Sequence, residues 1–513
     1  MNTVDELNAT KILQKRQRKR QQFTIARRRR RSPLFPSLLL ITIGLLERIQ
    51  SVSQFPSDHS SNAGRRNWNL AIETFPAVIV YAHTVQDVIS CISNEEECPA
   101  PLLPVGSMYS VSACLQNNDG TLLDMSQMSS ILGYNRETGI VSLQPGVQLA
   151  DLHEYLRQNH DREISFSPEI GDATVGSLTV ATSKDSSING PGYFSALVTS
   201  LQNVNHQGQL ITLDRELDAT AFQEFICSFG LKGVVVQVNV ETRPAQRIKT
   251  RFFSTKGLTS ADEAYNLLQK SRQSADNVFA LVSPHEGIMV TMERYNKSVQ
   301  DSLLYRVFNN VLLRMIQRVA FITIQHGIPF SDARSNNKYL GWTDTIAKVA
   351  SYWIMFDVVH YRNQLTNRYS KVMPTDQRLD FSFALFDDET KLEQVFKETY
   401  QFTQDWFEAT GFAPAGFNIY FGYRTGQKPF GEFSGPPGVS FAMDPYYGVP
   451  DDPNWERFVR ALNVKQKRQG AVFSPTQTRF LTSQTYDLTP LQQQNLVEER
   501  FLTTFYRRFL ASS

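Results

Sequence analysis

The chain has 513 residues, a formal net charge of +2, 41% apolar residues and 20% charged residues. These values are close to the averages of globular proteins, so most of the chain is expected to fold, and its length predicts two or three structural units. Residues 1–31 alone carry a charge of +9, which leaves −7 on the remainder and argues against a folded core that binds nucleic acid.

The N-terminal segment keeps several interpretations open. Blocks of like charge such as residues 1–31 are usually solvated, and they also occur in targeting segments and at membrane or nucleic-acid contacts. The apolar run at residues 34–46 allows membrane contact but is shorter than the roughly 20 residues that cross a bilayer. A long basic leader without a clear cleavage site disfavours a signal peptide, and the arginine-rich composition also fits a transit peptide. Export, membrane association, organelle import and a cytoplasmic location all stay open.

Cysteine and histidine are not spaced for cross-links or metal sites. The four cysteines form no Cys-x-x-Cys pair, so no disulfide framework is expected. The eight histidines lack both the i, i+4 spacing and the cysteine partners of a metal site, so we expect no metal.

Strands and helices are predicted to alternate from Trp68 onward. Thr84 is the expected N-cap of a helix, because Asp87 follows three residues later and apolar residues then recur at helical spacing. A second helix is predicted after Pro145-Gly146 and a short one near 222–227. The strands predicted in this half are 77–81, 102–105, 121–124, 140–143, 198–204, 209–213 and 234–240.

Three segments rich in small residues follow predicted strands. They are the turn Gly106–Ser110, the long loop Gly171–Ser187, and the stretch that contains Gly230 and Gly233. Small residues let backbone N–H groups approach and cradle phosphate oxygens. A long ordered loop inside a well-patterned domain is more often a binding loop than a linker. One such segment alone indicates ordinary turn chemistry, whereas three together favour a binding site.

Pro244 marks the predicted boundary of the first domain. Beyond it the chain is rich in aromatic residues, with strand candidates at 251–253 and 381–386 and a helix candidate at 303–317. The sequence contains no internal repeat.

Several motifs occur in a fixed order along the first half: Pro104–Ser110, Leu122–Met128, Val141–Gly146 with Leu149–Leu152, Gly171–Ser177 and Gly230–Val235. In this order they resemble the FAD-binding domain of the vanillyl-alcohol oxidase and p-cresol methylhydroxylase (PCMH) superfamily. Within it they are most similar to the L-gulonolactone and D-arabinonolactone oxidase branch. The resemblance covers about residues 68–245.

The resemblance implies an α+β fold. A two-subdomain, PCMH-type FAD-binding domain at 67–245 would be followed by a mixed α/β substrate (cap) domain at 246–513, whose C-terminal segment returns to the FAD domain. Residues 1–66 would be a basic, disordered segment. Gly106–Ser110 would hold the FAD pyrophosphate. The residues implied to bind FAD are Gly106, Ser107, Met108, Tyr109, Ser110, Asp172, Thr174, Gly176, Ser177, Thr182, Ser183, Asp185, Val234 and Val235.

The FAD-binding motifs depart from the family pattern at two positions. Tyr109 stands where many relatives carry the histidine that bonds covalently to the flavin, so noncovalent FAD is expected. Lys184 replaces the histidine of the family's Gly-Thr-His stretch. It either stabilises an anionic reduced flavin or, as its polar loop favours, lies at the surface. Gly176 and Ser177 are expected to leave room for the flavin ring.

The second half lacks the Glu-x-Arg and His-Trp-x-Lys signatures of lactone oxidases, so aldonolactone chemistry is not implied. The corresponding regions look like 417–421 and 474–479. The candidate catalytic residues in this half are Tyr420, Arg424, Gln477 and Arg479. The aromatic side chains in and after these regions indicate either a less polar substrate or an ordinary core: Tyr420, Phe421, Tyr423, Tyr446 and Tyr447.

The leading hypothesis is an FAD-dependent oxidoreductase. It would transfer hydride from a small alcohol-, lactone- or sterol-like substrate to the flavin, and oxygen or another acceptor would take the electrons. The alternatives are a flavin-binding protein without oxidase turnover and, less favoured, a chain that does not bind FAD.

Overall fold

The computed structural model describes residues 64–118, 120–166, 168, 170–185, 192–226, 228–296, 355–362, 380–424, 438–488 and 497–510. The apolar run at 34–46 and the helix predicted at 303–317 lie outside these residues. Within the described ranges, no helix has the length and apolar character needed to cross a membrane.

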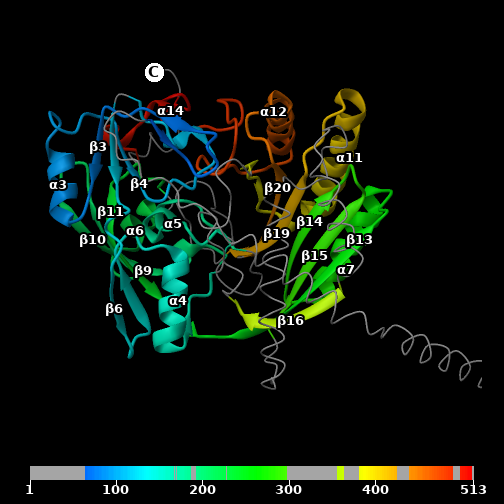
Figure 1. Cartoon of the computed structure of the whole chain (residues 1–513), viewed down its shortest axis with the longest axis horizontal. Coiled ribbons are helices and arrows are strands. Elements are labelled where there is room, and N and C mark those ends of the chain that lie inside the picture. Colours follow the sequence, from blue (N-terminus) through cyan, green and yellow to red (C-terminus); the bar gives the residue numbers. More distant parts are fainter. Residues whose placement is uncertain are drawn as a thin grey trace, which may run out of the picture. The chain divides into compact units, whose positions relative to one another are not determined.

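A small parallel sheet opens the first half (Figure 1). Its order is β3 (Val78–Tyr81), β5 (Thr121–Asp124) and β4 (Leu102–Val105). Helix α3 (Val85–Ser93) lies between β3 and β4 in sequence, and it has the predicted capping box. The Thr84 hydroxyl accepts a bond from the Asp87 N–H, and the Asp87 carboxylate accepts one from the Thr84 N–H. This N-terminal capping box could be predicted from the sequence because Thr84 and Asp87 lie within one helical turn.

An antiparallel sheet of five strands forms the second part of this half. Its order is β10 (Leu210–Asp214), β9 (Val198–Val204), β11 (Val234–Glu241), β7 (Ile140–Leu143) and β6 (Ile131–Asn135). Helix α4 (Leu149–His160) buries Leu149, Leu152 and Leu156, the three residues predicted to share a face. The shorter elements of this half are β1 (Arg65–Arg66), β2 (Glu73–Thr74), β8 (Arg162–Glu163), α5 (Val175–Val180), α6 (Ala219–Phe225) and β12 (Arg243–Pro244).

An antiparallel sheet of eight strands dominates the second half (Figure 1). Its main path is β16 (Met355–Tyr361), β13 (Arg247–Lys256), β15 (Ile288–Tyr295), β14 (Asn277–Ser283), β19 (Gly416–Arg424), β20 (Gly438–Tyr447) and β17 (Asp380–Phe381), and β18 (Leu385–Phe386) pairs with β20. The longer helices in the described part of this half are α7 (Ala261–Ser274), α11 (Leu392–Thr410) and α12 (Pro453–Arg468). Leu268 of α7 and Phe396 of α11 belong to one core with alternate residues of β14 and β19.

The strand predicted at 381–386 is wrong as a single element, because the structure has two short strands there. Between them the backbone N–H groups bond outside any regular ladder. Ser382 donates to the Pro445 carbonyl, Phe383 to the Gln477 carbonyl and Ala384 to the Asp444 carboxylate. The strand predicted at 251–253 is confirmed inside β13.

The C-terminal segment contacts the first half. The Arg500 guanidinium donates hydrogen bonds to the backbone carbonyls of Cys91 and Cys98, at 3.0 and 2.7 Å. Phe501 packs into the core beneath α3 and the parallel sheet. The short helix α14 (Thr504–Arg507) completes this segment.

Candidate functional site

A cavity of about 270 Å³ is lined by residues from both halves of the chain. From the first half come the small-residue turn and parts of the long loop: Gly106, Ser107, Met108, Tyr109, Ser110, Thr174, Ser177, Ser183, Lys184 and Asp185. From the second half come side chains of the large sheet and of one loop, chiefly Phe279, Arg294, Asn418, Tyr420, Asp444 and Gln477. The cavity therefore brings together two segments that the sequence marked separately.

The turn after β4 has the backbone geometry of an anion cradle. Met108 has a φ of 53°, a left-handed conformation that is uncommon outside glycine. Among the described residues, Gly106, Ser107 and Met108 donate no backbone–backbone hydrogen bond. Backbone N–H groups that are grouped in such a turn and not used in a ladder can bind phosphate oxygens.

Gly106 also permits the close approach of two chain segments. A Cβ atom at this position would overlap Oγ1 of Thr174 and would lie 2.9 Å from Oγ of Ser177. The two hydroxyls lie 2.9 Å from each other, just before and within α5. Only a residue without a side chain lets the turn and the loop face one cavity in this arrangement.

Gly176 packs against the turn after β7. Its backbone N–H donates to the Pro145 carbonyl at 2.8 Å, and an added Cβ would lie 2.7 Å from the Pro145 side chain. Gly176 is not among the residues that line the cavity, whereas Ser177 is. Its small size therefore lets α5 pack on the turn after β7.

Tyr109 is held in place by partners on both sides. Its hydroxyl donates to the Asp172 carboxylate at 2.7 Å. Its ring stacks on Trp68 with centroids 5.4 Å apart and an interplanar angle of 10°. Asp172 thus bonds a cavity-lining residue without being among the lining residues itself.

One face of the large sheet supplies the opposite wall. In β19, Phe417, Ile419 and Phe421 are buried in the core with α7 and α11, while Asn418 and Tyr420 line the cavity. This is the period-two alternation of a strand with one face on each side. Asp444 lies opposite Asn418 in β20, so it shares their face.

Lys184 is buried, which corrects the surface position favoured by its polar loop. Its side chain is 7% exposed and lines the cavity. Nζ lies 3.6 Å from Oδ2 of Asp444 and 4.7 Å from the centroid of the Tyr420 ring. The same Asp444 oxygen accepts a 2.6 Å hydrogen bond from the Tyr420 hydroxyl.

Burial controls the charge of this pair. It lowers the pKa of Lys184 to about 7, against the opposing attraction of Asp444. It also raises the pKa of Asp444, and Lys184 and the Tyr420 hydroxyl oppose that shift. An amine with a pKa near neutrality can take up and release protons at physiological pH.

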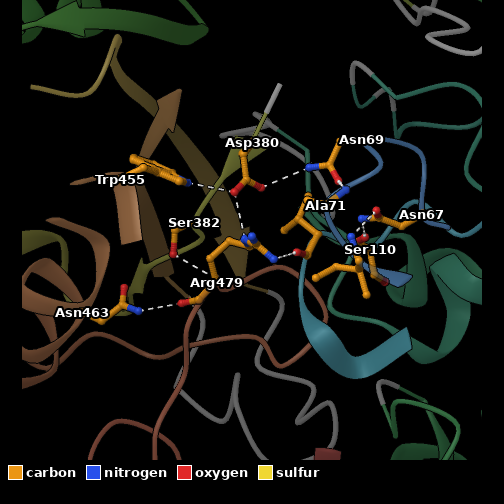
Figure 2. Close-up of polar contacts among 11 residues, drawn as sticks. Asn67, Asn69, Ala71, Ser110, Asp380, Ser382, Trp455, Asn463 and Arg479 are labelled. Atoms are coloured by element: carbon orange, nitrogen blue, oxygen red, sulfur yellow. Dashed lines mark hydrogen bonds and ion pairs between the residues drawn. The ribbon is translucent and has the colours of Figure 1, made fainter. Parts of the chain in front are cut away.

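Arg479, a predicted catalytic residue, is not among the residues that line the cavity. Figure 2 shows it beside Asp380 instead. Its Nε donates to the Asp380 carboxylate at 2.8 Å, and Nη1 donates to the Val111 carbonyl at 2.8 Å. Asp380 also accepts hydrogen bonds from Asn69 and from the Trp455 indole, at 3.2 and 2.9 Å. Arg479 is therefore a buried structural residue that links segments far apart in the sequence.

The other predicted residues outside the lining have structural surroundings. The Thr182 hydroxyl donates to the Ser474 hydroxyl at 2.8 Å. Val234 and Val235, at the start of β11, are buried in two hydrophobic clusters. Arg424 ends β19 opposite Gly438, and its side chain is outside the described part. Of the aromatic residues considered, Phe421 and Tyr446 belong to the core and Tyr420 lines the cavity.

Sequence reasoning missed several residues of the second wall, among them Phe279, Arg294, Asn418 and Asp444. Two of them had a usable signal. Asn418 alternates with large apolar residues, and Asp444 is the one carboxylate in the otherwise apolar and aromatic segment 439–447. Phe279 and Arg294 lie in strands whose pattern gives no hint of a ligand.

The described surroundings of the turn and loop fit a phosphate-bearing dinucleotide such as FAD. Three adjacent backbone N–H groups are available to an anion, and the hydroxyls of Thr174 and Ser177 lie beside them. No cluster of His, Cys, Asp or Glu in the described ranges could hold a metal ion.

Comparison with known sequences points to the same cofactor. Residues 76–214 match the family described as FAD binding domain. L-gulonolactone oxidase from Bos taurus is 23% identical over 208 residues, which are 40% of this chain and 46% of that protein. L-gulono-1,4-lactone dehydrogenase from Mycobacterium tuberculosis is 28% identical over 182 residues, 35% of this chain and 40% of that protein. The chain thus spans less than half the length of these relatives.

Comparison with solved structures extends the similarity in fold to nearly the whole chain. A variant of cholesterol oxidase from Brevibacterium sterolicum superposes with a TM-score of 0.63 at 15% identity, over 90% of this chain and 99% of that chain. Xylooligosaccharide oxidase from Myceliophthora thermophila superposes with a TM-score of 0.62 at 13% identity, over 90% of this chain and 97% of that chain. The predicted α+β fold with an FAD-binding domain is confirmed.

Proposed function

We propose that this chain, which carries an FAD-binding domain related to those of FAD-linked oxidases, is an FAD-dependent oxidoreductase. It would act on a hydroxyl-bearing carbon of a small organic substrate of the lactone, sterol or sugar type. The proposed organisation is an FAD-binding domain at 67–245, a substrate domain at 246–513 and a separate basic segment at 1–66.

One observation carries this proposal: a single cavity is lined by the small-residue loops of the first half and by the polar sheet face of the second half. A cofactor bound at Gly106 and Thr174 would therefore share its space with Asn418, Tyr420 and Asp444. A protein that held FAD only as a structural element would not need a second wall of polar and ionisable side chains around the same cavity.

FAD bound here would supply the hydride acceptor. The chain's own residues would bind and orient the substrate, since catalysis by such enzymes depends on placing the reacting C–H bond correctly. Asn418 offers an amide that can both donate and accept hydrogen bonds to substrate hydroxyls. The Phe279 and Tyr420 rings, stacked with centroids 6.0 Å apart, offer an apolar surface for a carbon skeleton.

The proposal is tested by mixing the flavin-loaded protein, without oxygen, with a panel of alcohols, lactones, sterols and sugars. We expect at least one class to bleach the visible absorbance of the flavin, and readmitted oxygen or an added acceptor dye to restore it. Restoration by oxygen would identify an oxidase, and restoration by the dye alone a dehydrogenase. FAD that stays oxidised with every member of the panel would favour the alternative, a flavin-binding protein without turnover.

We further propose that FAD is bound noncovalently. Tyr109 offers a phenol instead of an imidazole, and its hydroxyl already donates to Asp172 at 2.7 Å. Acid precipitation of the purified protein should therefore release all of the flavin into the supernatant, as measured by its absorbance. Flavin that stays on the denatured chain would contradict this, and peptide mass mapping would then show whether Tyr109 carries it.

A further inference from the structure

Lys184 is a buried ionisable group at the cavity, and its amine lies against Asp444 and over the rings of Phe383 and Tyr420. Lys184 Nζ is buried, and it has no hydrogen-bond partner within the described part of the chain. At 3.6 Å its contact with Asp444 is an ion pair without a hydrogen bond. Burying an amine with unused donors is unfavourable unless a further group pairs with it. Since Lys184 lines the cavity, that group can be a bound molecule.

The carboxylate beside it is fixed from two directions. Oδ2 of Asp444 accepts the Tyr420 hydroxyl at 2.6 Å, and Oδ1 accepts the Ala384 N–H at 2.9 Å. Neighbouring strands β19 and β20 supply Tyr420 and Asp444, so the sheet sets their separation. The Lys184 amine thus lies beside a fixed acceptor and over the Phe383 ring, and its side chain lines the cavity.

We propose that Lys184 is a catalytic residue that accepts the hydroxyl proton of the substrate, with Asp444 and Tyr420 as positioning residues. This inference rests on the proposed function. In the step, the substrate O–H bond breaks and its proton forms a new N–H bond on Nζ. The electron pair of that O–H bond becomes the second bond of the carbonyl group. The hydrogen of the adjacent C–H bond leaves with its electron pair, and bound FAD is the oxidant that takes it.

The protonation state of the pair suits this task. With burial lowering the pKa of Lys184 to about 7, much of the amine is neutral at physiological pH and can take a proton. Asp444 then stabilises the ammonium that forms. Among the described residues, the charged side chains that line the cavity with this amine are Asp444, Asp185 and Arg294, and the ring of Tyr420 lies beside it. Arg294 and Asp185 lie 4.0 Å apart and offset each other.

The first test compares flavin reduction by substrate in the FAD-loaded natural protein, Lys184→Met and Lys184→Arg. The natural protein should be reduced faster as pH rises through about 7. Lys184→Met should keep its FAD but lose roughly 100-fold or more in reduction rate together with this pH dependence. Lys184→Arg should be as slow, because guanidinium keeps its proton. Lys465 on α12 pairs with Glu398 on α11 and does not line the cavity, so Lys465→Met is the control that should keep the natural rate.

A second variant tests the positioning role of Asp444. Since Asp444 raises the pKa of Lys184, Asp444→Asn should move the midpoint of the rate profile to lower pH. A merely structural Asp444 would lower the rate at every pH without moving the midpoint.

A third measurement does not depend on turnover. In the unfolded chain lysine titrates near ~10.4, so between pH 7 and that value the unfolded state binds more protons than the folded state. The free energy of unfolding should therefore rise with pH across this window, and Lys184→Met should lack that rise.

The outcomes separate the two proposals. If the natural protein is reduced by substrate and Lys184→Met or Lys184→Arg is reduced equally well, the proton-transfer role is wrong while the oxidoreductase stands. If no substrate reduces the natural protein, the proposed function fails and takes this inference with it. Absence of the stability rise would show that the folded protein does not hold Lys184 as a neutral amine, which also contradicts the inference.

Discussion

A protein in which Arg479 is replaced by methionine should be less stable than the natural protein by about 3–5 kcal/mol in free energy of unfolding. The substitution leaves the carboxylate of Asp380 buried without its cationic partner, which lies 2.8 Å away in the natural protein. It also removes the hydrogen bond to the Val111 carbonyl. Equilibrium unfolding in denaturant at pH 8 measures the loss. Arg66→Met, which breaks an exposed pair with Glu73, should cost only about 0–1 kcal/mol.

The pH dependence of this variant provides an internal check. Burial raises the pKa of Asp380 to about 6, and Arg479 opposes the rise. An unfolded aspartate titrates near ~3.9, so between the two values the folded state binds more protons and stability falls as pH rises. Without Arg479 the folded pKa moves higher and the window widens. The deficit of Arg479→Met should therefore be smaller at pH 5 than at pH 8, and a deficit that is equal at both would contradict the assignment.

Gly106→Val should bind FAD roughly 5- to 150-fold more weakly than the natural protein. The new side chain would overlap the Thr174 hydroxyl and lie 2.9 Å from Oγ of Ser177, so the turn and the loop must move apart. Overpacking of this kind costs about 1–3 kcal/mol, and the expected fold-change corresponds to that cost falling on FAD binding. The retained flavin per chain after desalting, followed by titration of the stripped protein with FAD, measures the loss.

The matched control is Gly133→Val in β6, where nothing lies within 4 Å of an added Cβ. It should keep its flavin. If Gly106→Val keeps its full flavin content as well, the turn after β4 does not contact the cofactor. Most of the proposed binding residues would then have to be reassigned.

The sequence predicted those features whose determinants lie close together in the chain. The residues that determine the capping box at Thr84 and the apolar face of α4 lie within a few helical turns of one another. The order of small-residue segments was enough to indicate FAD, and the FAD-binding domain is confirmed. The structure has these predicted features because local propensity and tertiary packing favour the same conformation.

The sequence was misleading where a partner from far along the chain decides the outcome. Lys184 looks like a surface residue on its polar loop, and only Asp444 and Tyr420 from the second sheet explain why it is buried. Arg479 resembles a substrate-binding cation, yet its carboxylate partner is Asp380. Such pairs depend on how β19, β20 and the loop after α12 come together, which no local pattern specifies.

The alternation along β19 separates two kinds of genetic change. Substitutions at Phe417, Ile419 or Phe421 alter the packing against α7 and α11, whereas a substitution at Asn418 alters what the cavity presents. Mutations at different positions of the same strand can therefore change ligand preference and fold stability separately. A library that varies Phe279 and Asn418 should contain mostly folded members with altered substrate spectra, so new substrates can be reached through these two strands.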